Sequence, residues 1–357
     1  MQSRLDKLRG LMSQQELDAC LIMQPENRRY ISGFTGSAGA LVITSDAAIL
    51  VTDFRYITQA QDELTEGFVV ESYDKEIVDA IATLARNHRL KNLAVEADYV
   101  TLRFYDKLKT ACGGVDILPR EGLVESLRAV KDPYEIEKIS EAARLGDEAF
   151  SHILGMIKPG IPEMDIALEI EWTMRKKGAL RAAFDVIVAS GSRGALPHAK
   201  PSHRPLEPGD LVVMDFGAVV DGYCGDMTRT VCVGKASAKA REIYQVVSRA
   251  QAAGLAAVRA GRTGRDVDCE AREIIREAGY GDYFGHGLGH GVGLAVHESP
   301  RLSQSGTDPL PCGAVVTVEP GIYIPGWGGV RIEDLVVVRE TGCQILTRST
   351  KELLELD

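Results

Sequence analysis

The sequence lacks the cysteine spacing and the positive charge that mark two large classes of protein. Its seven cysteines are scattered, odd in number and without a CxxC pair, so a thiolate zinc site is not indicated. Free thiols in a reducing cytoplasm are favoured over disulfides. Lysine and arginine total 41 residues against 51 acidic residues, and the net charge of −10 argues against a nucleic-acid-binding surface.

Long apolar runs are missing as well. The amino terminus, "MQSRLDKLRGLMSQQELDAC", has leucines at helical spacing but no apolar core suited to a signal peptide. No later stretch approaches the length of a membrane-spanning helix, and the sequence shows no internal repeat. We therefore expect a cytoplasmic protein that does not associate with membranes.

The composition that is present is typical of a globular protein of about two domains. The chain has 357 residues, of which 45% are hydrophobic and 26% charged, close to the usual values. Over residues 1–128, strand-like runs such as "ALVIT", "AAILVTD" and "NLAVEA" alternate with helical stretches. This alternation predicts a small α/β domain.

A second domain is predicted over residues 129–357. Asp132 and Pro133 suit the N-cap and the first position of a long helix that would begin this domain. Three more amphipathic helices are expected in "PEMDIALEIEWTMRKKG", "AREIYQVVSRAQAAGLAAVRAG" and "TGRDVDCEAREIIREAG", with strands between and after them. This order predicts an α+β domain in which helices cover an antiparallel sheet whose other face is free to hold a site.

Two aspartates stand in an apparent hairpin, "VVMDFGAVVDGYCGDMTRTVCVG", where carboxylates are unfavourable unless a partner neutralises them. The dipeptide Asp221-Gly222 favours a two-residue type I′ turn. That turn would place Asp215 opposite Thr228 and make Asp215 and Asp226 diagonal neighbours on one face of the hairpin. Such a pair suits oxygen ligands for metal ions; alone, it could equally be two solvated aspartates on an edge hairpin.

Three histidines and two further glutamates repeat this pattern in the second domain. "FGHGLGHGVGLAVHESP" contains His286, His290 and His297 among glycines, so it is not an HExxH zinc-protease helix. "VVTVEPGIYIPGWGGVRIEDLVVV" places Glu319 and Glu333 in apolar, strand-like runs. Each of these residues alone would more often be a turn, core or solvated strand residue.

Taken together, four carboxylates and one histidine in such settings would be costly to fold without cations and supply enough ligands for two metal ions. An oxygen-rich set with one imidazole favours Mn²⁺, Co²⁺ or Zn²⁺ over a thiolate site, and the ligand set does not choose among these three metals. Of the three, we expect Mn²⁺ first. The five candidate ligands are Asp215, Asp226, His290, Glu319 and Glu333.

The order of these residues, with "GHGLGHGVGLAVHE", "VEPGIY" and "GVRIED", resembles the pita-bread metallopeptidases of the aminopeptidase P and prolidase branch. The resemblance extends to the amino-terminal domain through "NRRYISGFTGSAG" and "VTDFRYITQAQDE". It also includes "ASGSRGALPHAKPSHRPL", the segment that carries an extra active-site histidine in the family, here His198. Methionine aminopeptidases share the ligands but lack the amino-terminal domain, and creatinase shares the fold without the ligands.

The resemblance implies a role for each ligand. Asp215 would bind one metal ion, His290 and Glu319 the other, and Asp226 and Glu333 would bridge both. A water shared by the two ions would be the source of the nucleophile, since two cations lower the pKa of bound water.

The resemblance also implies a catalytic set beyond the metal ligands. Glu319 would move a proton between the water and the leaving nitrogen. His198 and His297 would face the scissile group, His286 would lie near the leaving proline, and Arg331 would support the carboxylates.

The substrate implied is the Xaa-Pro bond at a free amino terminus, a tertiary amide without an N–H. We expect an aminopeptidase P that acts on longer peptides. A prolidase restricted to dipeptides would share every chemical residue and stays open, as do a general aminopeptidase and a non-catalytic binding module on the same scaffold. A homodimer is implied by the family.

Overall fold

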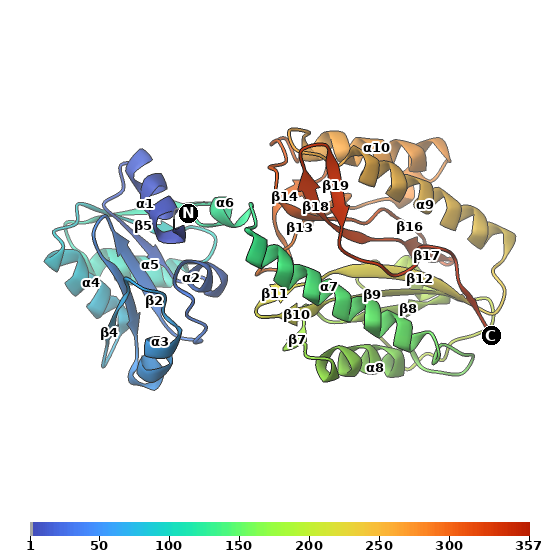
Figure 1. The fold of residues 1–357 in the computed structure, drawn as a ribbon, viewed down its shortest axis with the longest axis horizontal. Helices are drawn as coiled ribbons and strands as arrows, with labels where there is room; N and C mark the ends of the chain where they lie inside the picture. Colours follow the sequence, from blue (N-terminus) through green and yellow to red (C-terminus); the bar gives the residue numbers. More distant parts are fainter. Residues whose placement is uncertain (1–2) are drawn as a thin grey trace. The chain divides into compact units, whose positions relative to one another are not determined.

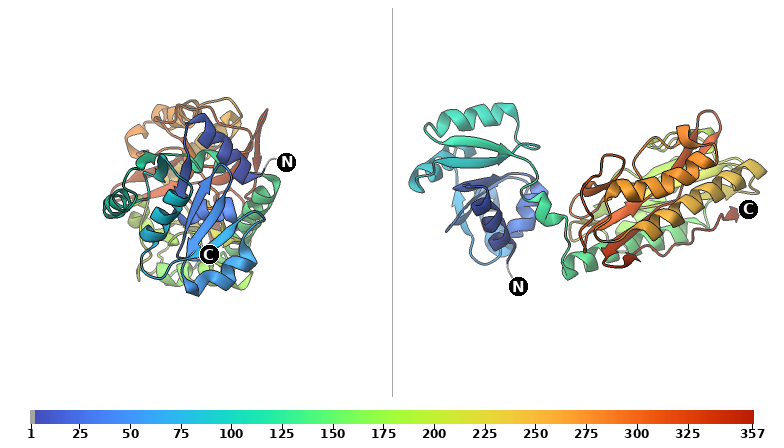
Figure 2. Two further views of the ribbon diagram at one scale, coloured as in Figure 1. Left: turned by 90° about the vertical axis from the view of Figure 1, so that its left-hand side faces the viewer. Right: turned by 90° about the horizontal axis from the view of Figure 1, so that it is seen from above.

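The computed structural model describes residues 3–357, which form two compact units that meet in the sequence between Arg128 and Ala129. Each unit has its own buried apolar core, and each is described separately below. Figure 2 shows the same ribbon from two further directions.

The amino-terminal unit is a six-stranded mixed sheet flanked by helices. The strands lie in the order β4-β3-β2-β1-β5-β6; β1 pairs antiparallel with β2 and parallel with β5. Its elements are α1 (Arg4–Gln14), β1 (Ala19–Ile22), α2 (Pro25–Ser32), β2 (Ala40–Thr44), β3 (Ala48–Thr52), η1 (Phe54–Tyr56), α3 (Ile57–Glu63), β4 (Val69–Ser72), α4 (Ile77–Asn87), β5 (Asn92–Glu96), α5 (Leu102–Ala111), β6 (Asp116–Arg120) and α6 (Glu125–Arg128). The α/β class expected for this region is confirmed.

The carboxy-terminal unit combines four longer helices with mainly antiparallel sheets. Its elements are α7 (Pro133–Ile153), α8 (Glu163–Lys176), β7 (Arg181–Ala182), β8 (Ile187–Ser190), η2 (Gly191–Ala195), β9 (Leu211–Phe216), β10 (Ala218–Val220), β11 (Tyr223–Cys224), β12 (Met227–Val233), α9 (Ala238–Ala257), α10 (Gly264–Glu277), η3 (Gly281–Tyr283), β13 (Gly289–Gly291), β14 (Glu298–Leu302), β15 (Val315–Val318), β16 (Gly321–Ile324), β17 (Gly328–Arg331), β18 (Asp334–Arg339), β19 (Gly342–Ile345) and β20 (Glu355–Leu356). The first of these helices begins as expected, because Asp132 caps it in a capping box with Glu135 and Pro133 occupies its first turn.

Two apolar cores divide this unit into two halves. In one half, α7 and α8 pack against β8, β9 and β12; in the other, α9 and α10 pack against β15 and β18. Figure 1 shows one helix pair on each side of the strands, so the strands lie between two helical layers. Polar side chains that the strands direct away from both cores can therefore meet in the middle of the unit.

The hairpin that holds the two aspartates has the expected register. Asp221 and Gly222 both have positive φ, 45° and 75°, as a type I′ turn requires. Asp215 lies opposite Thr228 in the antiparallel pairing of β9 with β12. The expected opposition of these two residues is thus confirmed.

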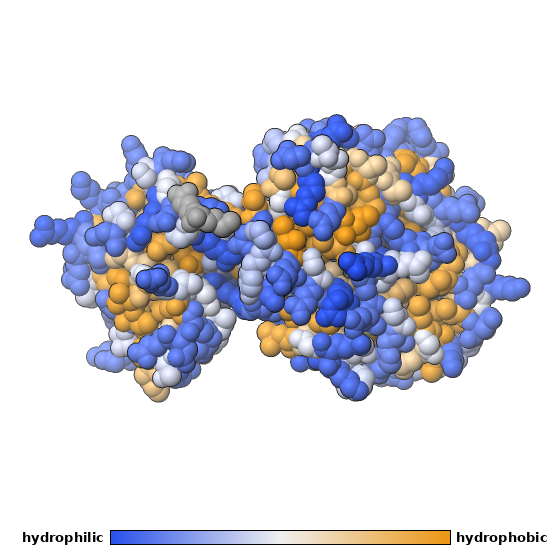
Figure 3. Space-filling view, viewed as in Figure 1, coloured by the Kyte–Doolittle hydropathy of each residue, from blue (hydrophilic) through white to orange (hydrophobic). Residues whose placement is uncertain are grey.

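The surface and the cysteines agree with the composition. Blue, hydrophilic residues cover much of the visible face in Figure 3, with apolar areas between them. Within residues 3–357, no helix is both long and apolar enough to cross a membrane. All seven cysteines are free thiols, as expected from their spacing.

Candidate metal centre

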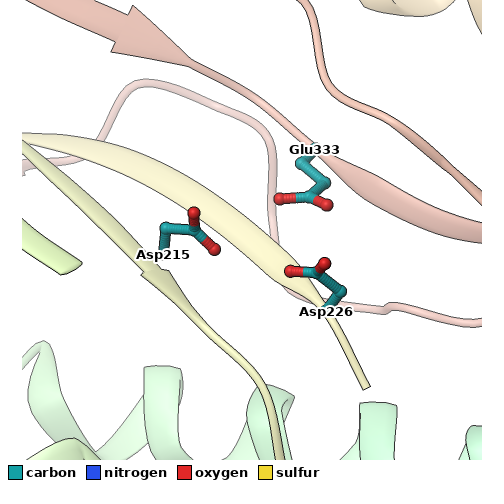
Figure 4. Close-up of side chains that lie close together, drawn as sticks. All are labelled: Asp215, Asp226 and Glu333. Atoms are coloured by element: carbon teal, nitrogen blue, oxygen red, sulfur yellow. The ribbon is translucent and has the colours of Figure 1, made fainter. Parts of the chain in front are cut away.

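Three carboxylates from different segments converge in the carboxy-terminal unit. Asp215 lies on β9, Asp226 directly precedes β12, and Glu333 lies between β17 and β18. Each offers one oxygen atom, and these three atoms all lie within 4.8 Å of one another. Figure 4 shows the side chains turned toward a common space.

The expectation that all four carboxylates stand inside strands is wrong for three of them. Only Asp215 is part of a strand; Asp226 and Glu333 occupy short breaks between strands, and Glu319 directly follows β15. Backbone irregularities of this kind turn a side chain away from the alternating pattern of a sheet. The site therefore uses strand ends to aim its carboxylates, a feature that apolar composition around them does not reveal.

Burial sets the electrostatics of the cluster. It is the largest cause that raises the pKa of Asp215, and with the neighbouring carboxylates it raises the pKa of Asp226 and Glu333 well above the ordinary range. Glu333 is only 1% exposed. One carboxylate oxygen of Asp215, Oδ1, and one of Glu333, Oε1, are buried without a hydrogen-bond donor among the described residues. The cluster thus presents unsatisfied acceptors in a space from which water is largely excluded.

His290 and Glu319 extend the cluster on its other side. His290 Nε2 lies 3.3 Å from Glu319 Oε1 and 3.6 Å from Asp226 Oδ2. Its other ring nitrogen, Nδ1, lies 3.1 Å from the carbonyl oxygen of Gly291. A ring that donates through Nδ1 keeps Nε2 directed at the carboxylates, the arrangement by which proteins orient a metal-binding histidine.

The pair formed by His290 and Glu319 behaves as an ion pair when no cation is present. Burial is the largest cause and opposes both charges, but the hydrogen bond between the two groups, their mutual attraction and further nearby charges together outweigh it. The pKa of Glu319 is thereby lowered to about 2, and the pKa of His290 is raised. Glu319 is consequently ionised at neutral pH.

Arg331, on β17, connects the clustered carboxylates with β9 and β12. Its Nη2 lies 2.5 Å from Asp215 Oδ2, with the arginine side chain 3% exposed. Its Nε donates to Thr228 Oγ1 at 3.0 Å, and that hydroxyl donates to Glu333 Oε2 at 2.6 Å. One guanidinium therefore holds two of the clustered carboxylates, one directly and one through Thr228.

His286 is held by a second contact of the same arginine. Arg331 Nη1 donates to the hydroxyl of Tyr323 at 2.8 Å, and that hydroxyl lies 2.9 Å from His286 Nε2. Nδ1 of His286 lies 2.7 Å from the carbonyl oxygen of Gly287. Because Nδ1 donates there, Nε2 accepts from the tyrosine, and burial, which lowers the pKa of His286, keeps the ring neutral.

The other two histidines lie at the exposed edge of the site. The ring of His297 is 4.3 Å from the ring of His290, centroid to centroid. Its pKa is lowered by burial first, then by the charge of His290, with a smaller effect from His198. His198 is exposed, and the carbonyl of its neighbour Pro197 accepts a hydrogen bond from Arg331 Nη1 at 3.3 Å.

Sequence reasoning did not single out Thr228 or Tyr323 as site residues. Thr228 appeared only as the partner of Asp215 in the hairpin register, which already put its hydroxyl on the face of the two aspartates. Tyr323 ends the quoted motif "VEPGIY", and burial raises its pKa to about 12, so it stays a hydroxyl at neutral pH. The role of a buried hydroxyl can be inferred from the sequence only when its hydrogen-bond partners are known.

The residues present fit divalent cations. The cluster contains the unsatisfied oxygens of Asp215 and Glu333, and the imidazole nitrogen Nε2 of His290 lies 3.6 Å from Asp226 Oδ2. Carboxylate oxygens with one imidazole form a ligand set that suits metals such as Mn²⁺, Co²⁺ and Zn²⁺. Together, the fold and this site define the class of the protein, an α/β domain followed by an α+β domain that carries a candidate metal centre.

Comparison with known proteins identifies the family within that class. A model of metallopeptidase family M24 matches residues 137–340, and a model of the creatinase/prolidase N-terminal domain matches residues 4–130. The chain therefore belongs to metallopeptidase family M24, with a pita-bread catalytic domain and a creatinase-type amino-terminal domain. It is an enzyme that hydrolyses peptide bonds.

Individual relatives match over nearly the whole length. An uncharacterized peptidase, YqhT, of Bacillus subtilis is 46% identical, with 99% of this chain and 100% of that protein covered. The solved structure of an Xaa-Pro dipeptidase from Bacillus anthracis has a TM-score of 0.96 at 44% identity and covers 99% of each chain. That of an X-Pro aminopeptidase from Thermotoga maritima has a TM-score of 0.91 at 41% identity and covers 99% of this chain and 100% of the other.

Proposed function

We propose that this metallopeptidase hydrolyses the Xaa-Pro bond at the free amino terminus of peptides. The observation that carries the proposal is the buried group of Asp215, Asp226 and Glu333, completed by His290 with its Nε2 directed at them. The names of the Bacillus anthracis and Thermotoga maritima structures support the Xaa-Pro substrate class.

We assign two divalent cations to the site, with Mn²⁺ preferred and Co²⁺ or Zn²⁺ as alternatives. Asp215 would hold one ion, His290 and Glu319 the other, and Asp226 and Glu333 both. When bound, the cations would supply Lewis-acid activation of the attacking water and of the scissile carbonyl. Metal analysis of the purified protein should find two ions per chain.

Side chains of the protein transfer the proton of the attacking water and bind the scissile carbonyl. Glu319, as a carboxylate, accepts a proton from the attacking water and delivers it to the proline nitrogen as the C–N bond breaks. The products are a free carboxylate on the first residue and a secondary amine on proline. His198 and His297 donate hydrogen bonds to the carbonyl oxygen as it acquires negative charge.

Arg331 and His286 keep the rest of the site in position. Arg331 fixes Asp215 directly and Glu333 through Thr228. His286, neutral and bonded to Tyr323, would lie beside the proline ring of the substrate. A neutral imidazole is compatible with an apolar ring, whereas a charged one would have to lose its hydration there.

Within this class we propose the aminopeptidase P type, which releases the first residue from peptides longer than two. The second candidate is a prolidase restricted to dipeptides, which the name of the Bacillus anthracis structure favours. The two differ only in the room beyond the proline, because the chemistry of the bond is the same.

A length series separates these candidates. Ala-Pro, Ala-Pro-Ala and a longer Ala-Pro peptide would be assayed separately with Mn²⁺, Co²⁺ and Zn²⁺. Cleavage of the longer peptides supports the aminopeptidase, and cleavage of Ala-Pro alone identifies a prolidase. Equal cleavage of Ala-Ala-Ala indicates a general aminopeptidase, and cleavage of none of the peptides indicates a binding module.

We also propose a homodimer in the cytoplasm, as the family resemblance implies. Sedimentation equilibrium of the purified protein tests the first part, with a mass twice the 38.7 kDa of one chain expected. A mass of a single chain at assay concentration would contradict it.

A further inference from the structure

A buried carboxylate binds both ends of the segment that carries His198. It is far from the candidate metal ligands in the sequence. Glu163, the first residue of α8, is fully buried. It accepts hydrogen bonds from both ends of residues 190–202. A buried carboxylate with several donors is a strong local constraint, because each donor would otherwise lose its partner.

The first end of the segment is bound by one carboxylate oxygen. Glu163 Oε1 accepts from the backbone N–H of Ser190 at 2.7 Å and from the hydroxyl of the same residue at 2.7 Å. Ser190 is the last residue of β8 and is itself fully buried. The point at which the segment leaves the sheet is thus fixed to the start of α8.

The second end is bound by the other oxygen. Glu163 Oε2 accepts from the backbone N–H of Ser202 at 3.1 Å and from its hydroxyl at 2.7 Å. Arg193, within the segment, donates to the same oxygen at 2.9 Å and to the carbonyl of Lys200 at 2.6 Å. The two ends of the segment and Arg193 within it therefore all bind the single carboxylate of Glu163.

His198 lies in the turn that this closure presents to the metal centre. The backbone N–H of Ala199 donates to the carbonyl of Leu196 at 3.1 Å, which places Pro197 and His198 in the middle of a turn. Arg331 donates to the carbonyl of Pro197 at 3.3 Å. The turn is thus bonded at one point to Arg331, which also binds Asp215, and its position otherwise depends on the residues at its base.

Glycines bring the base of the turn close to the strand that carries Arg331. A Cβ atom on Gly194 would lie 3.0 Å from the backbone nitrogen of Gly329, and one on Gly329 would lie 2.1 Å from the carbonyl oxygen of Gly194. Such close backbone contact leaves little freedom on that side. The remaining freedom of the segment is controlled from α8, where Glu163 lies.

We infer that Glu163 is a positioning residue for catalysis, which holds His198 where it can donate to the developing oxyanion. The inference rests on the proposed function, since it assigns to Glu163 an effect on turnover that acts through His198. Glu163 is not one of the three clustered carboxylates. A displacement of about 1 Å in a catalytic group can lower the rate by about 10². Hydrogen bonds that fix the backbone on both sides of His198 can therefore affect turnover.

The test is a double-mutant cycle of Glu163→Gln with His198→Ala on an Xaa-Pro substrate. His198→Ala alone should lower kcat by about 10² to 10³, as expected for the loss of one oxyanion donor. Glu163→Gln alone should lower kcat by about 10- to 10²-fold with little change in KM or in metal content. In the His198→Ala background, Glu163→Gln should change kcat by less than about twofold.

Two further variants distinguish an effect on the position of His198 from a general loss of stability. Ser202→Ala removes one donor and leaves the carboxylate in place, so it should lower kcat in the same direction by a smaller factor. Glu171→Gln is the matched control, because Glu171 lies on the same helix, is 38% exposed in its side chain and pairs with Arg175. This control should leave kcat unchanged.

Hydrogen exchange provides a readout that does not depend on activity. Glu163→Gln should speed amide exchange in residues 190–202 and leave α9 and α10 unchanged. Equal losses of kcat in both backgrounds, or unchanged exchange in the segment, would overturn the inference. Absence of Xaa-Pro cleavage by the wild-type enzyme would instead refute the proposed function, with the exchange result still deciding whether Glu163 holds the segment.

Discussion

Glu333 and Asp334 are neighbours in the sequence, each is 1% exposed, and yet their surroundings are opposite. Among residues 3–357, the carboxylate of Glu333 has one hydrogen-bond donor, Thr228, and burial with nearby carboxylates raises its pKa well above the ordinary range. Asp334 is surrounded by cations and donors, and these outweigh burial and lower its pKa. Equal burial therefore does not imply equal chemistry; the partners decide.

Asp334 is part of a structural network. Arg229 Nη2 donates to Asp334 Oδ1 at 2.9 Å, and the side chains of both residues are 1% exposed. Lys351 lies 2.5 Å from Asp334 Oδ2. The same arginine donates to the backbone carbonyl of Glu333. The satisfied carboxylate thus holds in place the backbone of the unsatisfied one, which we propose as a metal ligand.

The largest expected effect comes from neutralising the unsatisfied carboxylate. Glu333→Gln should lower turnover on Xaa-Pro peptides by at least about 10³, because it removes one of the charges that the metal ions share. Metal content, measured by elemental analysis of the purified variant, should fall below that of the wild type. Full metal occupancy with normal turnover would remove Glu333 from the ligand set. Asp226→Asn should behave in the same way.

Neutralising the satisfied carboxylate should instead unfold the protein more readily. Asp334→Asn leaves the buried guanidinium of Arg229 without its counter-ion, a change that typically costs about 3–5 kcal/mol. Thermal denaturation of the metal-free variant should show a Tm lower by roughly 6–20 °C, at about 2–4 °C per kcal/mol. A variant as stable as the wild type would show that Lys351 and Gln251 compensate for the lost charge.

Removing the metal ions should destabilise the wild-type protein. Clustered carboxylates repel each other without cations, and ions that bind only the folded state stabilise it by about 2.7 kcal/mol at 100 times their Kd. Chelation should therefore lower the Tm, and return of Mn²⁺ should restore it. The Glu333→Gln variant is the control, since its Tm should respond less to the same cycle.

The smallest expected effect is that Glu333→Gln stabilises the metal-free protein, although it removes a proposed metal ligand. The folded-state pKa of Glu333 lies above its ordinary value of 4.5, so its contribution to stability is present below that pH and is lost as pH rises. Metal-free Glu333→Gln should therefore melt higher than metal-free wild type at pH 8, by a few degrees. The difference should shrink on acidification toward pH 5. A difference that does not change with pH would contradict the raised pKa.

Local features of the fold were predictable from the sequence because their causes are local. The type I′ turn at Asp221-Gly222 and the two-residue period of its strands placed Asp215 opposite Thr228. The capping of α7 by Asp132 was readable for the same reason. The wrong expectation, that Asp226, Glu319 and Glu333 lie within strands, arose because apolar runs do not reveal where a strand is interrupted.

From the sequence alone, the α/β and α+β classes, the hairpin register, the motifs of the family and the five candidate ligands could be predicted, whereas Thr228, Tyr323 and Glu163 could not. Tertiary packing brings Glu333 to other carboxylates and Asp334 to Arg229, connects Arg331 to His286 through Tyr323, and lets Glu163 bind both ends of the segment of His198. The physical reason is that turns, caps and periodicity depend on neighbours along the chain. Burial, pKa and hydrogen-bond partners depend on segments that are distant in the sequence and that packing brings together.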